Sequence, residues 1–354
     1  MKVELSTATG TERIDDLLRG LIGLFEALFP VRIRSYYLGG SYSDGTAVGD
    51  DRSPNSSDVD LFVIFRGTVK EVDYASFDRL VASCRLTSPI QVDAHAYSED
   101  DLLQRPGKDA TQSSFLNALI KVAGVLIYGD DLGVVLPAVP FTRYVLDVIE
   151  SGVFHLGIPR QREDLAYPLR EPLVPPLTYP NAAGEFYGYD VVPARPDAPP
   201  GTRVLVGITA WIATLILALE TGRYAGQKSQ SIQLCKAFLP NDKRTQLAAA
   251  INDTCKGAWG YGLPDDAEDR ERLRGWCRDT LALENEYLRL CRRYVLAQLQ
   301  QGSAEEKRQA AHILHSVIYW DNEMVTALKV LAHASDEGVR SGAAKTLAIM
   351  ERSS

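Results

Sequence analysis

Two apolar runs, Ile33–Leu38 and Leu61–Phe65, flank a polar stretch that opens with Gly39-Gly40 and closes with Asp58-Val59-Asp60. Bulky aromatic and branched side chains predict that both runs are strands, and paired glycines permit a tight turn directly after the first. A nearly unbroken apolar run is typical of a buried strand. Two carboxylates at the start of such a strand are costly without a counter-charge, which the fold or a ligand must supply.

The rest of the N-terminal region predicts a small domain around these strands. Apolar residues recur at helical spacing from Ile14 to Leu28, and Pro30 ends the run. The sequence IQVDAHAY at 90–97 alternates as a half-buried strand does, and a helix is expected over Phe115–Ile127. Three strands around one glycine turn make a small mixed sheet, so we expect residues 1–135 to form one domain of an α+β protein.

The remaining chain is expected to be helical after a proline-rich segment. Residues 136–200 are interpreted as a connecting helix followed by an arm, because ten prolines lie between 159 and 200 and the aromatic cluster at 184–190 is unusual for a free linker. A helical domain is expected over 201–300, with helices at Val204–Leu219, Ile232–Phe238, Thr245–Lys256 and Asp266–Gln300. Three short helices in 301–354 resemble HEAT repeats and are too few to stand alone, so we expect them to dock as a cap.

Composition limits the classes of function that are open. The net charge of −8 argues against a general electrostatic attraction for nucleic acid, although residues 201–260 hold seven Lys or Arg against three Asp or Glu, a local balance of +4. The five cysteines lack CxxC spacing, so we expect buried thiols in a reducing compartment. The longest uncharged run, Val204–Leu219, is shorter than the roughly 20 residues that span a bilayer. We therefore expect a cytoplasmic protein without a membrane span; the oligomeric state is not predicted.

Three acidic residues predict a metal site. Asp58 and Asp60 lie on the same face of a strand because side chains alternate with a period of two. Asp93 lies on the later alternating strand, within reach if the two strands are neighbours. Converging carboxylates repel one another unless a cation neutralises them, and Mg²⁺ prefers oxygen ligands completed by substrate phosphates. His95 lacks a partner His or Cys and is not expected to be a ligand.

The glycines beside these acids predict a phosphate cradle. Gly39 and Gly40 let the backbone bend and approach a ligand closely, Ser41 adds a hydroxyl, and amides that follow can hold an anion. A phosphate cradle beside clustered carboxylates suits in-line displacement at phosphorus.

Gly39-Gly40-Ser41, Asp58-Val59-Asp60 and the later Asp93 together resemble the DNA polymerase beta-like nucleotidyltransferase superfamily, and most of all its aminoglycoside adenylyltransferases. The resemblance implies that the glycines and Ser41 hold the nucleotide phosphates and that Asp58 and Asp60 bind Mg²⁺. It implies that Asp93 is either a third metal ligand or the base for the acceptor hydroxyl. It also implies a lysine near a serine that reaches the triphosphate; Lys228-Ser229 is the nearest match, in reversed order.

The resemblance implies transfer of AMP, or another nucleoside monophosphate, from Mg-ATP or another NTP to a hydroxyl of a small acceptor such as an aminoglycoside. Nucleotidyl transfer to tRNA or protein is an alternative, for which the +4 segment would serve tRNA, and oligonucleotide synthesis is another. A non-catalytic partner-binding scaffold is the alternative from a different class. Each of these remains open at the level of sequence.

Other acids are expected to be solvated. Asp44, Asp50 and Asp51 belong to a polar, turn-rich loop between Ser41 and Asp58. Glu284 and Glu286 are interpreted as part of the solvated face of the long 266–300 helix, where they could attract a polycationic acceptor.

Overall fold

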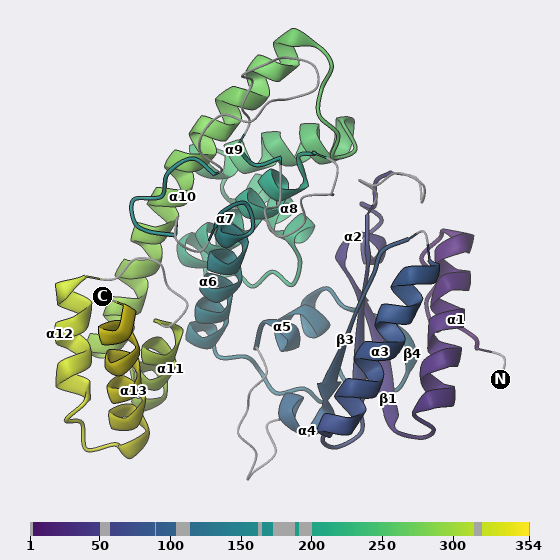
Figure 1. Cartoon of the computed structure of the whole chain (residues 1–354), viewed down its shortest axis with the longest axis horizontal. Helices are drawn as coiled ribbons and strands as arrows, with labels where there is room; N and C mark the ends of the chain where they lie inside the picture. Colours follow the sequence, from purple (N-terminus) through teal and green to yellow (C-terminus); the bar gives the residue numbers. More distant parts are fainter. Residues whose placement is uncertain are drawn as a thin grey trace. The chain divides into compact units, whose positions relative to one another are not determined.

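The computed structural model describes residues 3–49, 57–88, 90–103, 114–161, 165–172, 188–190, 200–314 and 321–353. The chain divides into two compact units, and each is described by itself (Figure 1). The first unit consists of Met1–Val139 and Arg223–Leu234, and the second consists of Pro140–Gly222 and Cys235–Ser354. The second unit is therefore interrupted by twelve residues that belong to the first.

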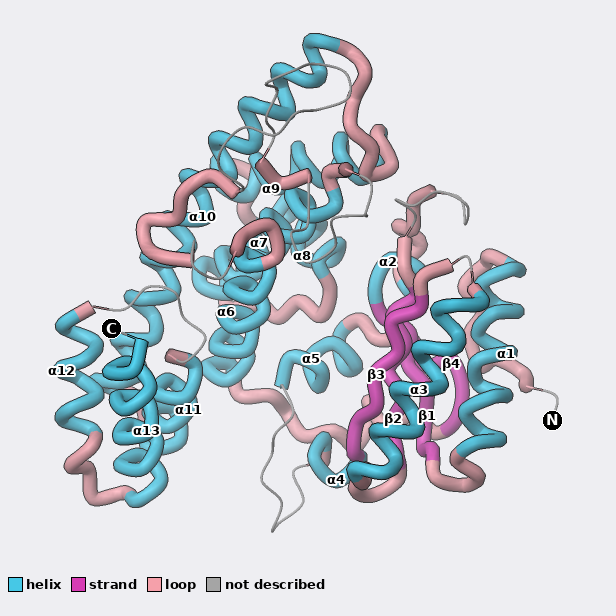
Figure 2. Tube along the Cα trace, viewed as in Figure 1, coloured by secondary structure: helices cyan, strands magenta, loops and turns pink. Residues whose placement is uncertain are grey.

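The first unit contains a four-stranded mixed sheet in the order β3-β2-β1-β4 (Figure 2). Its strands are β1 (Ile33–Gly39), β2 (Val59–Phe65), β3 (Val92–Ser98) and β4 (Val125–Gly129). β1 is antiparallel to both β2 and β4, whereas β2 and β3 run parallel. The mixed sheet and the three strands expected from the sequence are confirmed, as is the coarse α+β class.

The predicted helix over Phe115–Ile127 is wrong in its second half. The helix α5 (Ser114–Val122) ends before Gly124, whose Cα lies so close to α5 that a Cβ there would stand 2.8 Å from the Ile120 Cα. The next residues pair with β1 as β4. Short apolar runs fit a buried helix or a buried strand equally well, and here the strand partner decides.

Helices cover both faces of this sheet (Figure 1). On one face, α1 (Glu12–Leu28) and α3 (Glu71–Thr87) bury Phe25 and Phe77 against the alternating side chains of β2 that include Val63 and Phe65. On the other face, α4 (Glu99–Leu102) and α5 cover Tyr37 and Ile64. The carboxylate of Asp60 is on this second face because it is two residues from Phe62 and four from Ile64.

Among the residues described, the second unit is helical. Its first elements are α6 (Phe141–Gly157), α7 (Arg203–Thr221), α9 (Lys243–Ile251), a π-helical turn (Asn252–Ala258) and α10 (Ala267–Gln301). α8 (Lys228–Phe238) begins in the first unit and ends in the second. By length and composition α7 could cross a membrane, but 72% of its most apolar window is buried among its neighbours. The five cysteines are all buried and free, as expected.

The C-terminal helices α11 (Ala304–Ile313), α12 (Asn322–Leu331) and α13 (Glu337–Ser353) pack on one another and on α10. Two of them, α11 and α12, contact α10 directly, whereas the likeness of this region to HEAT repeats stays a prediction. The hydroxyl of Thr346 in α13 is buried and donates to the Ala311 carbonyl of α11 at 2.8 Å, which fixes one helix against the other. The finer division into four domains stays a prediction.

The interpretation of Glu284 as a solvated acid is wrong. Its side chain in α10 is fully buried, and its two oxygens accept hydrogen bonds from Arg160 at 3.0 and 2.6 Å. The hydroxyl of Tyr189 donates to the same carboxylate at 2.7 Å. Tyr189 belongs to the predicted proline-rich arm, and residues 188–190 of that arm are buried; the other aromatic residues of its cluster, Phe186 and Tyr187, lie outside the described residues.

Candidate functional site

The carboxylates of Asp58, Asp60 and Asp93 lie together at one end of the parallel pair β2 and β3. Asp60 and Asp93 are direct neighbours in the strand register, and Asp58 comes just before β2. One oxygen from each carboxylate lies within 4.8 Å of the other two, and all three side chains are half-buried. Val59 between the two β2 acids is fully buried on the opposite face, as expected. The fold therefore brings the three predicted acids into one cluster.

The Gly39-Gly40 pair is required by this cluster. β1 ends at Gly39 and continues into the short turn helix α2 (Gly40–Ser43), with Gly40 at φ +63°. A Cβ on Gly40 would stand 1.9 Å from Asp60 Oδ2, and a Cβ on Gly39 would stand 2.5 Å from Cε2 of Phe62. Glycine at both positions lets β2 side chains lie against the backbone that carries Ser41. Two of the three predicted cradle residues, Gly39 and Gly40, therefore lie directly beside Asp60.

Asp93 has a counter-charge that the sequence analysis missed. Arg85, near the end of α3, donates to Asp93 Oδ1 at 2.7 Å and to the Val92 carbonyl at the same distance. Gln91 donates to Asp93 Oδ2 at 3.1 Å. The Arg85 guanidinium offsets part of the repulsion among the three acids. Arg85 could not be identified from sequence, because α3 buries only Phe77, Val81 and Cys84 and its amphipathic pattern is weak.

Aromatic rings continue the same sheet face beyond the acids. Phe62 and His95 are neighbours in the register, with ring centroids 6.5 Å apart, and the Tyr97 ring is 6.0 Å from that of Phe62. Burial lowers the pKa of His95, with the charge of Asp93 opposing that shift, and burial raises the pKa of Tyr97 to about 12. Both groups are therefore neutral near pH 7. Among the described residues, the cluster of possible metal ligands consists of Asp58, Asp60 and Asp93.

Lys228 and Ser229 belong to the first unit, although they are far from its other residues in sequence. Ser229 donates a hydrogen bond to Asp44, the residue after α2, and Lys228 beside it is exposed. Asp44 is exposed, as expected, but it also accepts hydrogen bonds from the backbone and the hydroxyl of Thr46. Asp50 and Asp51 lie outside the described residues. The segment that contains the predicted Lys-Ser pair therefore contacts the turn after Ser41.

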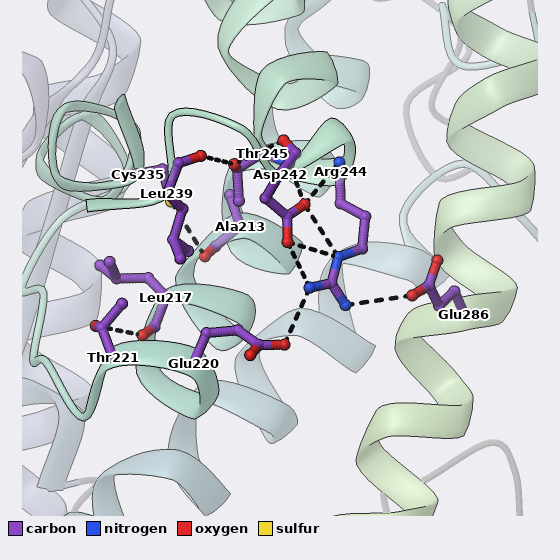
Figure 3. A network of polar contacts seen from close by, with 10 residues as sticks. All are labelled: Ala213, Leu217, Glu220, Thr221, Cys235, Leu239, Asp242, Arg244, Thr245 and Glu286. Carbon is purple, nitrogen blue, oxygen red and sulfur yellow. Dashed lines mark hydrogen bonds and ion pairs between the residues drawn. The ribbon is translucent and has the colours of Figure 1, made fainter. Parts of the chain in front are cut away.

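Several charges of the predicted +4 segment are paired within the second unit. Arg244 contacts three carboxylates, those of Asp242, Glu220 and Glu286 (Figure 3). Lys236 forms an ion pair with Asp253 at 2.7 Å. Glu220, Asp242 and Asp253 are already included in the +4 balance of residues 201–260, so only Glu286, which lies outside that segment, lowers the local positive charge further.

Comparison with known proteins adds no relative to these observations. No family model matches the chain, and no curated protein matches it in sequence. The chemistry of the site therefore has to be argued from its residues: three clustered carboxylates, one arginine and a glycine-dependent turn.

Proposed function

We propose that the protein is a metal-dependent nucleotidyltransferase that moves a nucleoside monophosphate, most simply AMP from ATP, to a hydroxyl of a small acceptor and releases pyrophosphate. One observation carries the proposal: oxygens of Asp58, Asp60 and Asp93 lie within 4.8 Å of one another, directly beside the Gly40 turn. Clustered carboxylates next to a closely approachable backbone suit a site that holds a divalent cation and a phosphate chain together.

The donor set fits Mg²⁺. It consists of hard carboxylate oxygens from half-buried residues, without cysteine or histidine in the cluster. Asp58 and Asp60 would hold the metal, which would neutralise charge on the transferring phosphoryl group when bound. Arg85 pairs with Asp93, and a divalent cation would balance the repulsion among carboxylates that lie this close together.

The chain's own residues would position the reactants. Gly40 keeps the Asp60 carboxylate against the backbone of the turn, so the ligands and the phosphate-binding segment form one rigid arrangement. Arg85 and Gln91 donate hydrogen bonds to the two oxygens of Asp93. Those bonds orient the carboxylate, and they suit it either as a further ligand or as the acceptor of the proton from the attacking hydroxyl.

The test is pyrophosphate release by the purified chain with Mg²⁺ and each of the four NTPs. The arms are no acceptor, a panel of aminoglycosides, and total tRNA. Release with one NTP and one sugar would support transfer to a small molecule. Release with NTP alone would indicate oligonucleotide synthesis. Release that requires tRNA would indicate that the acceptor is a macromolecule.

Variants make this test specific to the site. We expect Asp58→Asn and Asp60→Asn to lower turnover by on the order of 1,000-fold, because metal neutralisation of the phosphoryl group contributes several kcal/mol. The matched control is Asp16→Asn, which changes an exposed acid of α1 that pairs only with the exposed Arg19 among the contacts described. Near-normal turnover in Asp60→Asn, or silence of the wild type in every arm, would contradict the proposal and favour a scaffold.

A further inference from the structure

We infer that Gln227 and Ser229 are positioning residues that hold the Gly40–Asp44 turn, although they lie 184 and 185 positions after their partners in the sequence. We call these two side chains and their partners Ser43 and Asp44 the 227–229 clasp. The inference rests on the proposed function, because it assigns the clasp the task of fixing the backbone that would approach the nucleotide phosphates. All four residues belong to the first unit.

The first half of the clasp is a relay of hydrogen bonds that ends at Gly40. The side-chain amide of Gln227 donates to Ser43 Oγ at 2.7 Å, and that hydroxyl donates to the Gly40 carbonyl at 2.8 Å. The second amide hydrogen of Gln227 goes to the Ala123 carbonyl, after α5, at 2.9 Å. Because a carbonyl can only accept, this bond fixes which end of the amide points to the turn. Gln227 thereby connects the turn to α5.

The second half of the clasp is a separate set of hydrogen bonds to the residues that follow in the turn. Ser229 donates to Asp44, which accepts from the backbone N–H and the hydroxyl of Thr46 at 3.0 and 2.7 Å. The N–H of Thr46 also donates to the Ser41 carbonyl at 3.0 Å. The carbonyls of Gly40 and Ser41, two of the three residues expected to contact phosphate, are therefore each bound within a network that reaches residues 227–229.

The segment that supplies the clasp is itself anchored. Gly226 lies against α5, where a Cβ would stand 2.8 Å from the Leu119 Cα, and the hydroxyl of Tyr224 donates to the Val139 carbonyl at 2.7 Å. Gln227, which directly precedes α8, is only 7% exposed, unlike Gln233 within α8, which is exposed. A buried glutamine that donates both of its amide hydrogens to defined acceptors is suited to fix the position of the turn. Moving the turn would break these hydrogen bonds and leave the acceptors unsatisfied.

Hydrogen exchange tests the clasp without reference to activity. Gln227→Glu keeps the size of the side chain but removes both hydrogen-bond donors. Ser43→Ala removes the hydroxyl that connects Gln227 to the Gly40 carbonyl, and this smaller substitution serves if Gln227→Glu folds poorly. Each is expected to make amides in 40–46 exchange about fivefold faster, the effect of losing one neutral hydrogen bond, and together they should do little more than either alone. Gln233→Ala is the control. Unchanged exchange in both clasp variants would overturn the inference.

Kinetics then tests the positioning role. Both variants should raise the KM for the nucleotide by about tenfold or more and lower kcat, whereas KM for the acceptor stays near the wild-type value, because the turn is misplaced only at the phosphates. Faster exchange with unchanged nucleotide kinetics would overturn the role in positioning. If the wild type releases no pyrophosphate in any arm, the nucleotidyltransferase proposal fails, and exchange alone still decides whether the clasp holds the turn.

Discussion

The carboxylate of Asp60 lies against the Cα of Gly40, with 1.9 Å between Asp60 Oδ2 and the position a Cβ would take. No real Cβ tolerates such a contact, so any side chain at Gly40 must push the Asp60 carboxylate away. Gly40 also adopts φ +63°, a conformation that costs other residues free energy. The turn and the carboxylate cluster are thus mutually dependent.

Gly40→Ala is expected to abolish the site, and Gly45→Ala supplies the control. Gly45 has φ +72°, but among the described residues no atom beyond its chain neighbours lies within 4 Å of its Cβ position. Both substitutions therefore cost roughly 1 kcal/mol of backbone strain, while only Gly40→Ala displaces Asp60. We expect Gly40→Ala to lower turnover by about 100-fold or more, the effect of a displacement near 1 Å. Titration with Mn²⁺ should show weakened binding for Gly40→Ala and unchanged binding for Gly45→Ala; equal behaviour of the two variants would contradict the interpretation.

Asp60→Asn is expected to weaken metal binding without lowering the stability of the metal-free protein. Without divalent cations the variant should be as stable as the wild type or up to about 1 kcal/mol more stable, because one of three mutually repelling and partly solvated charges is removed. With Mg²⁺ at 100 times its Kd the wild type should gain about 2.7 kcal/mol and the variant far less. Calorimetric unfolding with EDTA and with Mg²⁺ measures both. A wild-type Tm that changes with neither Mg²⁺ nor Mn²⁺ would argue against a metal site.

Strand patterns made much of the first unit predictable. The alternation around Asp58 and Asp60 determines which face their side chains share, and the apolar run that follows requires burial on both faces. α5 and β4 could not be separated in the same way, because the residues on either side of Gly124 are apolar in both states and only pairing with β1 selects the strand. The local sequence pattern therefore does not predict β4, because this strand depends on pairing with a strand that is distant in sequence.

The acids of the site were predictable, but their partners were not. Asp93 pairs with Arg85 from a helix that the pattern did not predict, and Gln227 reaches Ser43 across 184 positions. The prediction for Glu284 was wrong for a related reason. Its polar sequence neighbours on a long helix indicate a solvated acid, whereas Arg160 and Tyr189, from distant segments, donate hydrogen bonds to its carboxylate in the core. Charged residues reveal their burial only through partners that three-dimensional structure supplies.

Arg160→Met is expected to destabilise the second unit by about 3–5 kcal/mol, because it leaves the Glu284 carboxylate buried without its cation. The double variant Arg160→Met/Glu284→Leu should recover most of that loss, since no buried charge remains. Urea unfolding followed by tryptophan fluorescence measures this unit, because Trp211, Trp259 and Trp276 all lie in it.

Arg274→Met is the control for that experiment. Arg274 pairs with Glu271 on the same helix, α10, but both side chains are substantially exposed, so its loss should change the free energy of unfolding by no more than about 1 kcal/mol. Equal losses for Arg160→Met and Arg274→Met would mean that burial of the Arg160–Glu284 pair does not determine its contribution.

Asp242 is expected to make the second unit sensitive to acid. It caps α9 by accepting from the backbone N–H groups of Arg244 and Thr245, and its hydrogen bonds with the Arg244 side chain lower its pKa below the ordinary value of 3.8, with the cap contacts adding to the shift (Figure 3). The folded state therefore takes up this proton less readily than the unfolded chain. The resulting stability is fully present above pH 3.8 and is lost as the pH falls through the lower, folded value.

Two substitutions separate the charge from the cap. Asp242→Asn retains a side-chain oxygen for the cap but cannot ionise, so its difference from the wild type should shrink as the pH falls below 3.8. Asp242→Ala loses both and should cost about 1–2 kcal/mol more than Asp242→Asn at every pH. Urea unfolding by tryptophan fluorescence from pH 7 to 2.5 provides the curves, and other acids cancel in the differences. A constant difference between Asp242→Asn and the wild type across this range would show that Arg244 does not hold the carboxylate ionised.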